Sequence, residues 1–248
     1  MPGPGGAAAA ARPGAAAFTA RLTALADPVR AAGMAQFFQT GPGGYGEGDT
    51  FLGLTVPQVT GVAREFVGLP VGELETLLDS PLHEVRLGAL KVMARECAAA
   101  RTTDARRREL RDLYLRRTDR VNGWDLVDAS APDVLGRSLL AGPRDVLRVL
   151  ARSPDLWERR IAIVATFPLI RTGELDETFA LAEELLGDRH DLIHKATGWM
   201  LREAGKRDEA RLREFLDRYA ATMPRTALRY SLERLDPVVR AHYMAALA

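Results

Sequence analysis

The sequence is short of several kinds of residue, and each shortage excludes a class of protein. The only cysteine is Cys97, so the chain cannot form an internal disulfide and suits a reducing cytoplasm. No apolar run approaches the roughly 20 residues that span a bilayer, so we expect no membrane partner. Aromatic residues make up only 6% of the chain, and period-two strand patterns of β-branched and aromatic residues are almost absent. The sequence therefore predicts a cytoplasmic, all-α protein.

Lysine is also scarce, although basic residues as a class are not. The chain has 34 basic residues and a net charge of +1, and the lysines are Lys91, Lys195 and Lys206. Arginine can bind phosphate through two parallel hydrogen bonds, but a chain rich in Arg and Ala can equally reflect a GC-rich genome. Only clustering of the arginines on one face would indicate a polyanionic partner.

Residues 1–16, MPGPGGAAAAARPGAA, are of low complexity and are predicted to be a disordered tail. Gly, Pro and Arg12 interrupt the alanines, so the tail does not have the apolar core of a secretory signal. The remaining residues, 17–248, are expected to form a single domain. From Phe18 onward, segments with helical periodicity alternate with short breakers that contain Gly or Pro.

A recurring unit organises this helical domain. Related segments begin at four places along the chain: Ser80 (SPLHEVR), Ser153 (SPDLWERR), Arg189 (RHDLIHKATGW) and Thr222 (TMPRTALRY). Their spacing fits a period of about 35–37 residues with two helices per unit, which is typical of HEAT and armadillo solenoids. One further unit falls near NGWDLVD (122–128). We expect the stacked units to bring NGWDLVD, WERR and KATGW to one groove.

Three patterns suggest chemistry but have simpler interpretations. GPGGYG (41–46) matches a dinucleotide-binding pattern, yet no βαβ unit surrounds it. It is interpreted as a connector between helices, or as a loop whose amides and Tyr45 touch a ligand or a phosphate backbone. His190 and His194 have the spacing of a zinc pair but lack the intervening glutamate, so we expect no metal and a helix that starts nearby, at Asp188 or Asp191. Cys97 is expected to be an inert core thiol.

NGWDLVD is the most informative segment. The segment has two interpretations. In the first, Asn122 or Asp125 caps a helix and Trp124 packs into the core. In the second, the segment forms a functional site. Trp124 and Asp128 are four residues apart and share a helix face, whereas Asp125 points elsewhere and is expected to be structural. Trp199 recurs two repeats later. Basic residues that follow the same repeat register are expected to line the groove: Arg159, Arg160, Lys195, Arg202, Arg225 and Arg229.

In this order, five segments resemble the HEAT-like-repeat DNA alkylation repair proteins, the AlkD-like alkylpurine DNA glycosylases. They are GMAQFFQTGPGGYGEGDTFLGLTVP (33–57), NGWDLVD (122–128), LWERRIAIV (156–164), DLIHKATGWMLREAGKRD (191–208) and MPRTALRYSLER (223–234). The resemblance covers about residues 18–245. It implies a C-shaped stack of antiparallel helix pairs whose concave face holds duplex DNA. It also implies hydrolysis of the N-glycosidic bond of 3-methyladenine and 7-methylguanine by a monomer, without metal, cofactor or base flipping.

The resemblance also assigns roles to individual residues. Trp124 and Trp199 would form aromatic walls around the deoxyribose, Asp128 would be the catalytic carboxylate, and Arg160 and Arg202 would hold backbone phosphates. The sequence departs from the best-known active member at Gly123, where that member carries another tryptophan, and in the loop 40–50. Some relatives bind branched or distorted DNA without excision. That function, and a repeat scaffold for protein partners, are therefore the alternatives to a glycosylase.

Overall fold

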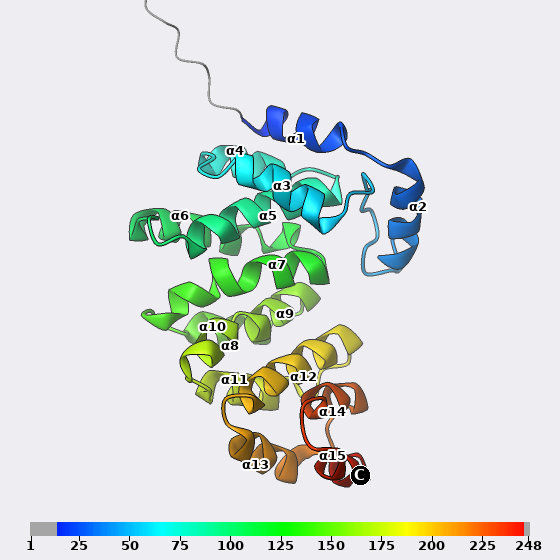
Figure 1. Ribbon diagram of the computed structural model, residues 1–248, viewed down its shortest axis with the longest axis vertical. Coiled ribbons are helices and arrows are strands. Elements are labelled where there is room, and N and C mark those ends of the chain that lie inside the picture. Colours follow the sequence, from blue (N-terminus) through cyan, green and yellow to red (C-terminus); the bar gives the residue numbers. More distant parts are fainter. Residues whose placement is uncertain (1–13, 246–248) are drawn as a thin grey trace, which may run out of the picture.

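The computed structural model describes residues 14–245 as a stack of α-helices (Figure 1). Within these residues the only extended pairing is an isolated bridge between Thr50 and Leu82, so the all-α prediction is confirmed. No helix in the described part of the chain is long and apolar enough to cross a membrane. Residues 1–13 of the predicted tail lie outside the described residues. The first helix begins at Ala15, two residues before the expected domain start, and Phe18 and Leu22 anchor it in the core.

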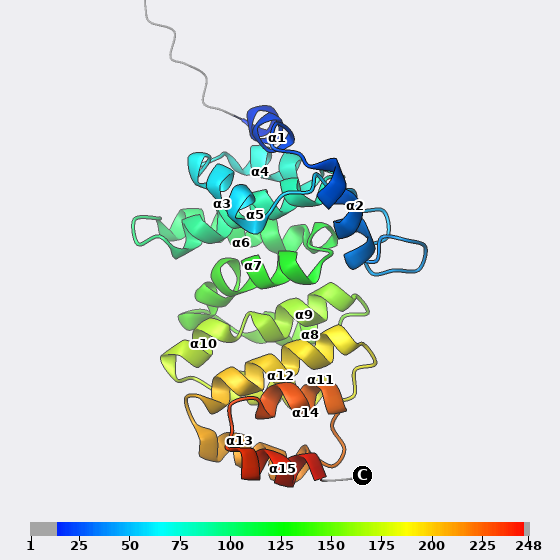
Figure 2. The same ribbon diagram turned by 45° about the vertical axis from the view of Figure 1, so that its right-hand side comes forward.

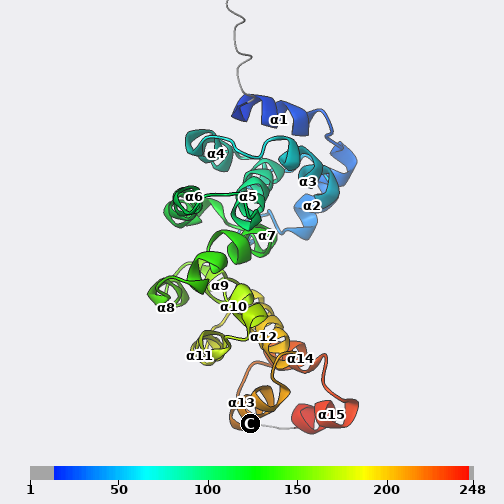
Figure 3. The same ribbon diagram turned by 60° about the vertical axis from the view of Figure 1, so that its left-hand side comes forward.

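The helices form two columns, as the helical-repeat prediction requires (Figure 3). The inner column consists of α3 (Val56–Glu65), α5 (His83–Ala98), α7 (Trp124–Val134), α9 (Leu156–Val164), α12 (Asp191–Gly205) and α14 (Arg225–Leu232). The outer column consists of α4 (Val71–Leu78), α6 (Asp104–Arg116), α8 (Asp145–Ala151), α11 (Asp176–Leu185) and α13 (Glu209–Tyr219). Successive inner helices pack on one another, so α7, α9 and α12 are consecutive neighbours.

Further elements cover the ends and the turns of the stack. They are α1 (Ala15–Thr23), α2 (Pro28–Phe37), η1 (Thr118–Arg120), η2 (Gly136–Leu140), α10 (Phe167–Thr172) and α15 (Pro237–Ala245). In Figure 3, α2 and α15 project on the same side beyond the middle of the inner column, which gives the stack a shallow C shape. Figure 2 shows that α2 and the loop after it stand out from the rest of the stack. The concave side is therefore bounded by the inner column and these two ends.

The inner helices pack closely because their buried residues recur at helical spacing. In α12, Ile193, Ala196, Met200 and Ala204 are fully buried and lie three or four residues apart. Gly198 lies on the side that meets α14, where an added Cβ would come within 2.4 Å of a backbone oxygen. A side chain at this position would separate the two helices. The hydrophobic periodicity in the sequence thus determined both the helix and its buried face.

The glycine-rich loop connects α2 to α3 and is not a dinucleotide site, because it follows a helix and no strand precedes it among the residues described from Gly14 onward. The buried carboxylate of Glu84 fixes the end of the loop by accepting hydrogen bonds from three consecutive amides, those of Leu52, Gly53 and Leu54, at 2.8–3.1 Å. Gly53 has a φ of +81°, and a Cβ there would lie 2.1 Å from the carbonyl oxygen of Asp27. Only glycine allows this approach of the loop to the start of α2.

Candidate functional site

Asp128 and Trp199 lie in one cleft on the inner column. The cleft has a volume of about 550 Å³ and is lined by the end of α7, by η2, by α10 and by α12. Such a volume is in the range of ligand sites. The residues that give the cleft its chemical character are Asp128, Arg137, Phe167, Arg171 and Trp199. Asp133, which pairs with Arg137, lines the cleft as well, so the structure joins two carboxylates, two guanidinium groups and two aromatic rings from four elements.

The Asp128 carboxylate is held by Arg160. Arg160 Nε donates to Asp128 Oδ1 at 2.9 Å, and Nη2 donates to Oδ2 at 2.8 Å. The third nitrogen, Nη1, donates to the carbonyl of Leu192, so the guanidinium joins α9 to both α7 and α12. Burial raises the pKa of the Asp128 carboxyl above its usual range, and the hydrogen bonds and charge of Arg160 oppose that rise only in part.

This placement of Arg160 differs from the expected phosphate contact. Arg160 is only 4% exposed, and all three of its nitrogens bond to the protein. A guanidinium in that position cannot reach a phosphate without breaking its bonds to Asp128. Sequence register placed Arg160 on the correct helix but could not show that it faces the neighbouring helices. In the structure Arg160 holds the Asp128 carboxylate, and its contact with a DNA phosphate stays a prediction.

Trp124 lies one turn before Asp128 on α7, as the four-residue spacing predicts, but does not itself line the cleft. Gly123 is the N-cap and makes no side-chain capping bond, so neither Asn122 nor Asp125 caps the helix. The half-buried Trp124 ring stacks on Phe38, with centroids 5.7 Å apart and planes at 10°. On the other side of the cleft, Trp199 packs on Phe167 at 6.2 Å.

The other predicted DNA-binding residues differ in their accessibility. Arg225 and Arg229 are exposed on α14, and Arg225 donates to the carbonyl of Met244 at 2.7 Å. Three more take part in ion pairs within the protein: Arg159 with Asp188, Lys195 with Asp191, and Arg202 with Glu233. These pairs compete with phosphates but do not prevent binding at partly exposed positions. The DNA contacts of these residues stay predictions.

The sequence interpretation missed two cations that line the cleft, Arg137 and Arg171. Arg137 pairs with Asp133 at 2.6 Å and is 40% exposed, and Arg171 is exposed at the end of α10. They lie about one repeat apart in the sequence. A search for arginines in repeat register outside the inner helices could have found them.

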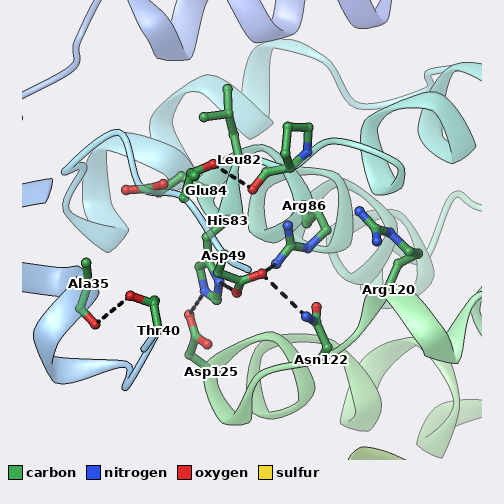
Figure 4. Close-up of polar contacts among 12 residues, drawn as sticks. Ala35, Thr40, Asp49, Leu82, His83, Glu84, Arg86, Arg120, Asn122 and Asp125 are labelled. Carbon is green, nitrogen blue, oxygen red and sulfur yellow. Dashed lines mark hydrogen bonds and ion pairs between the residues drawn. The ribbon is translucent and has the colours of Figure 1, made fainter. Parts of the chain in front are cut away.

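A second polar cluster, also missed, adjoins the start of α7 (Figure 4). The His83 ring is 1% exposed and lies between two carboxylates, with Nδ1 2.8 Å from Asp49 and Nε2 2.8 Å from Asp125. Asp125 thus faces His83, not the cleft, which agrees with the expected structural role. Burial alone would lower the pKa of His83, but the hydrogen bonds to Asp125 and Asp49 outweigh it and raise the pKa to about 9. Burial alone would raise the pKa of the Asp49 carboxyl, but the hydrogen bonds and charges of His83 and Arg86 outweigh it and lower this pKa overall.

Because of this shift, we expect the free energy of unfolding to fall as the pH rises from about 6.5 to about 9. The raised pKa means that the folded state binds the proton more tightly, so this stabilisation is complete below pH 6.5 and is lost as His83 deprotonates at about pH 9. Its full size is about 3 kcal/mol. Urea unfolding of the wild type and His83→Gln across this range measures it. An equal fall in both proteins would contradict the prediction. Arg86 and Lys91 of α5 and Asp128 of α7 also interact electrostatically with these carboxylates.

The remaining candidate groups have structural roles. The His190 side chain caps α12 by accepting from the Leu192 amide at 3.2 Å, and α12 begins at Asp191, one of the two expected starts. His194 bonds to the carbonyl of Asp188 at 2.6 Å. Cys97 is buried, and burial raises the pKa of its thiol to about 12, as expected for an inert core cysteine. Among residues 14–245 no cluster of three or more His, Cys, Asp or Glu side chains could hold a metal ion.

Comparison with known proteins gives two matches of different kinds. The family model described as DNA alkylation repair enzyme matches residues 18–235. Among solved structures, the chain is similar to one described as "Predicted DNA alkylation repair enzyme from Enterococcus faecalis", with a TM-score of 0.67 and 17% identity over 86% of this chain and 97% of that chain. At this identity the structural likeness shows the fold alone. A search of curated proteins gave no match. Because the family match spans most of the sequence, the chain belongs to the DNA alkylation repair enzyme family.

Proposed function

We propose that the protein hydrolyses the N-glycosidic bond of cationic alkylated purines, such as 3-methyladenine and 7-methylguanine, in duplex DNA without flipping the base. Family membership supports the coarser statement, a role in DNA repair. The observation that carries the finer proposal is the meeting of Asp128 and Trp199 in one open cleft between α7, η2, α10 and α12. Trp124 lies one turn before Asp128 on the same helix face.

The proposed chemistry needs only one carboxylate. An alkylated purine already carries a positive charge, so it can leave without a general acid. As the bond breaks, positive charge develops on the deoxyribose, and the Asp128 carboxylate would stabilise this charge and orient the attacking water. The electron-rich faces of Trp124 and Trp199 would add to this stabilisation. Glycosidases that act on neutral sugars use two carboxylates because their leaving groups must be protonated.

The arginines of the cleft divide between two proposed roles. Arg160 is buried and would hold Asp128 in its catalytic orientation. Arg137 and Arg171, at the edge of the cleft, would bind the phosphates on either side of the lesion. Lys195, Arg202, Arg225 and Arg229, which lie on α12 and α14, would add further phosphate contacts. A DNA backbone that lies along these residues would bring the deoxyribose to Asp128.

One observation favours a second function, the binding of branched or distorted DNA without excision. Both oxygens of Asp128 accept hydrogen bonds from Arg160, which partly neutralises the charge that catalysis would use. Base release decides between the two functions. A glycosylase should release 7-methylguanine or 3-methyladenine from methylated duplex, whereas tight binding of junction DNA without release would establish the second function. A protein scaffold would show no salt-dependent affinity for DNA.

The proposed phosphate contacts predict a specific salt dependence. Arg137→Ala and Arg171→Ala should each reduce the slope of log K against log [salt] by about 0.9, because each removes one phosphate contact. Arg152→Ala is the matched control, since Arg152 is 70% exposed and pairs with Glu184 away from the cleft. Fluorescence anisotropy with a labelled duplex gives the slopes. Unchanged slopes for both cleft variants would show that Arg137 and Arg171 do not contact DNA phosphates.

A further inference from the structure

His83 joins two parts of the chain that flank the predicted site. Its ring nitrogens contact Asp49, in the loop between α2 and α3, and Asp125, in the first turn of α7. An ionised carboxylate can only accept hydrogen bonds, so both ring nitrogens donate and the ring is an imidazolium. Asp49, His83 and Asp125 form a buried negative–positive–negative row, here called the clamp (Figure 4).

The loop side of the clamp is fixed on α5. Arg86 Nη2 donates to the second oxygen of Asp49 at 2.6 Å, and Arg86 is itself 1% exposed. The neighbouring Glu84 holds the amides of residues 52–54. Three polar side chains in the first turn of α5, those of His83, Glu84 and Arg86, therefore bind the same short piece of loop. The clamp extends this attachment from α5 to α7.

An aromatic stack connects the clamp to Trp124. Phe51 stacks on the His83 ring, with centroids 4.7 Å apart. Phe38 stacks on Phe51 at 5.0 Å and, with its planes at 10°, on Trp124 at 5.7 Å. Phe38 and Phe51 belong to the two ends of the loop that Asp49 holds. The position of the loop therefore determines the position of the Phe38 ring, and this ring covers one face of the Trp124 indole.

Gly123 belongs to the same arrangement. A Cβ at this position would lie 3.0 Å from Asp125 Oδ1 and 3.2 Å from His83 Cε1, closer than ordinary van der Waals contact. Its φ of −159° is extended backbone that any residue can adopt, so the constraint is the space beside the clamp and not the backbone. The glycine that departs from the pattern of the best-known relative is thus the residue that leaves His83 and Asp125 undisturbed.

We propose that the Asp49–His83–Asp125 clamp is a positioning device, which holds the α2–α3 loop on α5 and α7 so that Phe38 fixes the orientation of the Trp124 indole beside Asp128. His83 is a positioning residue and touches no reacting atom. The effect on excision rests on the proposed function, but the effect on Trp124 does not. Breaking the clamp should release the loop and let the Trp124 ring reorient while the helical stack stays folded.

Fluorine NMR of protein labelled with 5-fluorotryptophan tests the clamp directly. The chain has three tryptophans, whose signals are assigned by Trp→Phe variants. In His83→Gln and Asp49→Asn, the Trp124 signal should shift and broaden, and the Trp199 signal should stay. The Trp157 signal should respond weakly, because Tyr45 of the loop contacts that ring at 5.9 Å. Glu96→Gln is the matched control, since it neutralises another buried carboxylate of α5, one that pairs with Arg106.

The wild type provides the same test without a substitution. Its Trp124 signal should move when the pH is raised through about 9, where His83 loses its proton, and the Trp199 signal should stay. The pH titration of the wild type tests the clamp even if His83→Gln does not fold. A Trp124 signal that is unchanged in folded clamp variants, or unchanged in the wild type above this pH, would overturn the proposal.

Excision measurements then add a functional outcome. In single-turnover base release, His83→Gln should lower the rate constant roughly 10–100-fold, the cost of a misplaced group in a catalytic arrangement, with little change in DNA affinity. A purely structural defect would lower the rate constant and the DNA affinity together, in proportion to the loss of folded protein. If the wild type releases no base but its Trp124 signal responds as expected, the proposed function fails and the clamp stands. If release occurs and the Trp124 signal does not respond, only the clamp fails.

Discussion

Asp128→Asn is expected to lower the rate of base release from methylated duplex DNA by about 10²–10³-fold, the typical loss when one group that stabilises transition-state charge is removed. DNA affinity should stay nearly unchanged, because the carboxylate acts on charge that develops only as the bond breaks. Asparagine keeps the shape of the side chain and one acceptor for Arg160, so the fold should be preserved. Single-turnover release of 7-methylguanine and 3-methyladenine measures the rate constant.

Asp133→Asn is the matched control for this variant. Asp133 lies on the same helix, lines the same cleft and is paired with an arginine, Arg137, but it lies outside the Trp124–Asp128 face. Its excision rate should stay within a few-fold of the wild type. Equal losses in both variants would indicate that cleft charge in general, and not Asp128, supports the reaction. Full activity of Asp128→Asn would exclude its catalytic role.

Arg160→Ala is expected to have the largest effect on stability, a loss of about 3–5 kcal/mol in the free energy of unfolding. The guanidinium is 4% exposed and joins three inner helices through Asp128 and the carbonyl of Leu192. Its removal leaves the half-buried carboxylate of Asp128 without its counter-charge, an unpaired carbonyl and a cavity. Urea unfolding at neutral pH measures the loss, with Arg152→Ala as a surface ion-pair control that should cost at most about 1 kcal/mol.

A double-mutant cycle separates the ion pair from the packing of the Arg160 stem. Arg160→Met keeps much of the apolar volume, and combining it with Asp128→Asn removes both charges. The double variant should be more stable than the sum of the two single losses predicts, with a coupling of about 1–3 kcal/mol. Additive losses would show that Arg160 stabilises the protein through packing alone. A loss below about 1 kcal/mol for Arg160→Ala would contradict the central position assigned to this side chain.

Local sequence patterns were sufficient for the helices and for part of the site. Apolar residues three or four apart give α12 its buried stripe, and the repeat spacing correctly made α7, α9 and α12 neighbours. Trp124 and Asp128 share a face because four residues are close to one helical turn. The meeting of Asp128 with Trp199 in one cleft follows from the same repeat register.

The contacts that the sequence interpretation did not predict lie between elements that are far apart in the sequence. Arg160 was expected on a phosphate because register identifies the helix and not the direction in which a long side chain turns; burial against α7 and α12 directs it to Asp128. The clamp was missed because Asp49, His83 and Asp125 are separated by 34 and 42 residues in the sequence and share no periodicity.

The sequence by itself determined the helices, their order in the stack and the face on which Trp124 and Asp128 lie, because these depend on hydrophobic spacing along the chain. The tertiary structure decided the partner of each charged side chain. A buried charge needs a counter-charge beside it, and tertiary packing decides which charged side chains lie close enough to provide one. Packing brought Arg160 to Asp128 and His83 between Asp49 and Asp125.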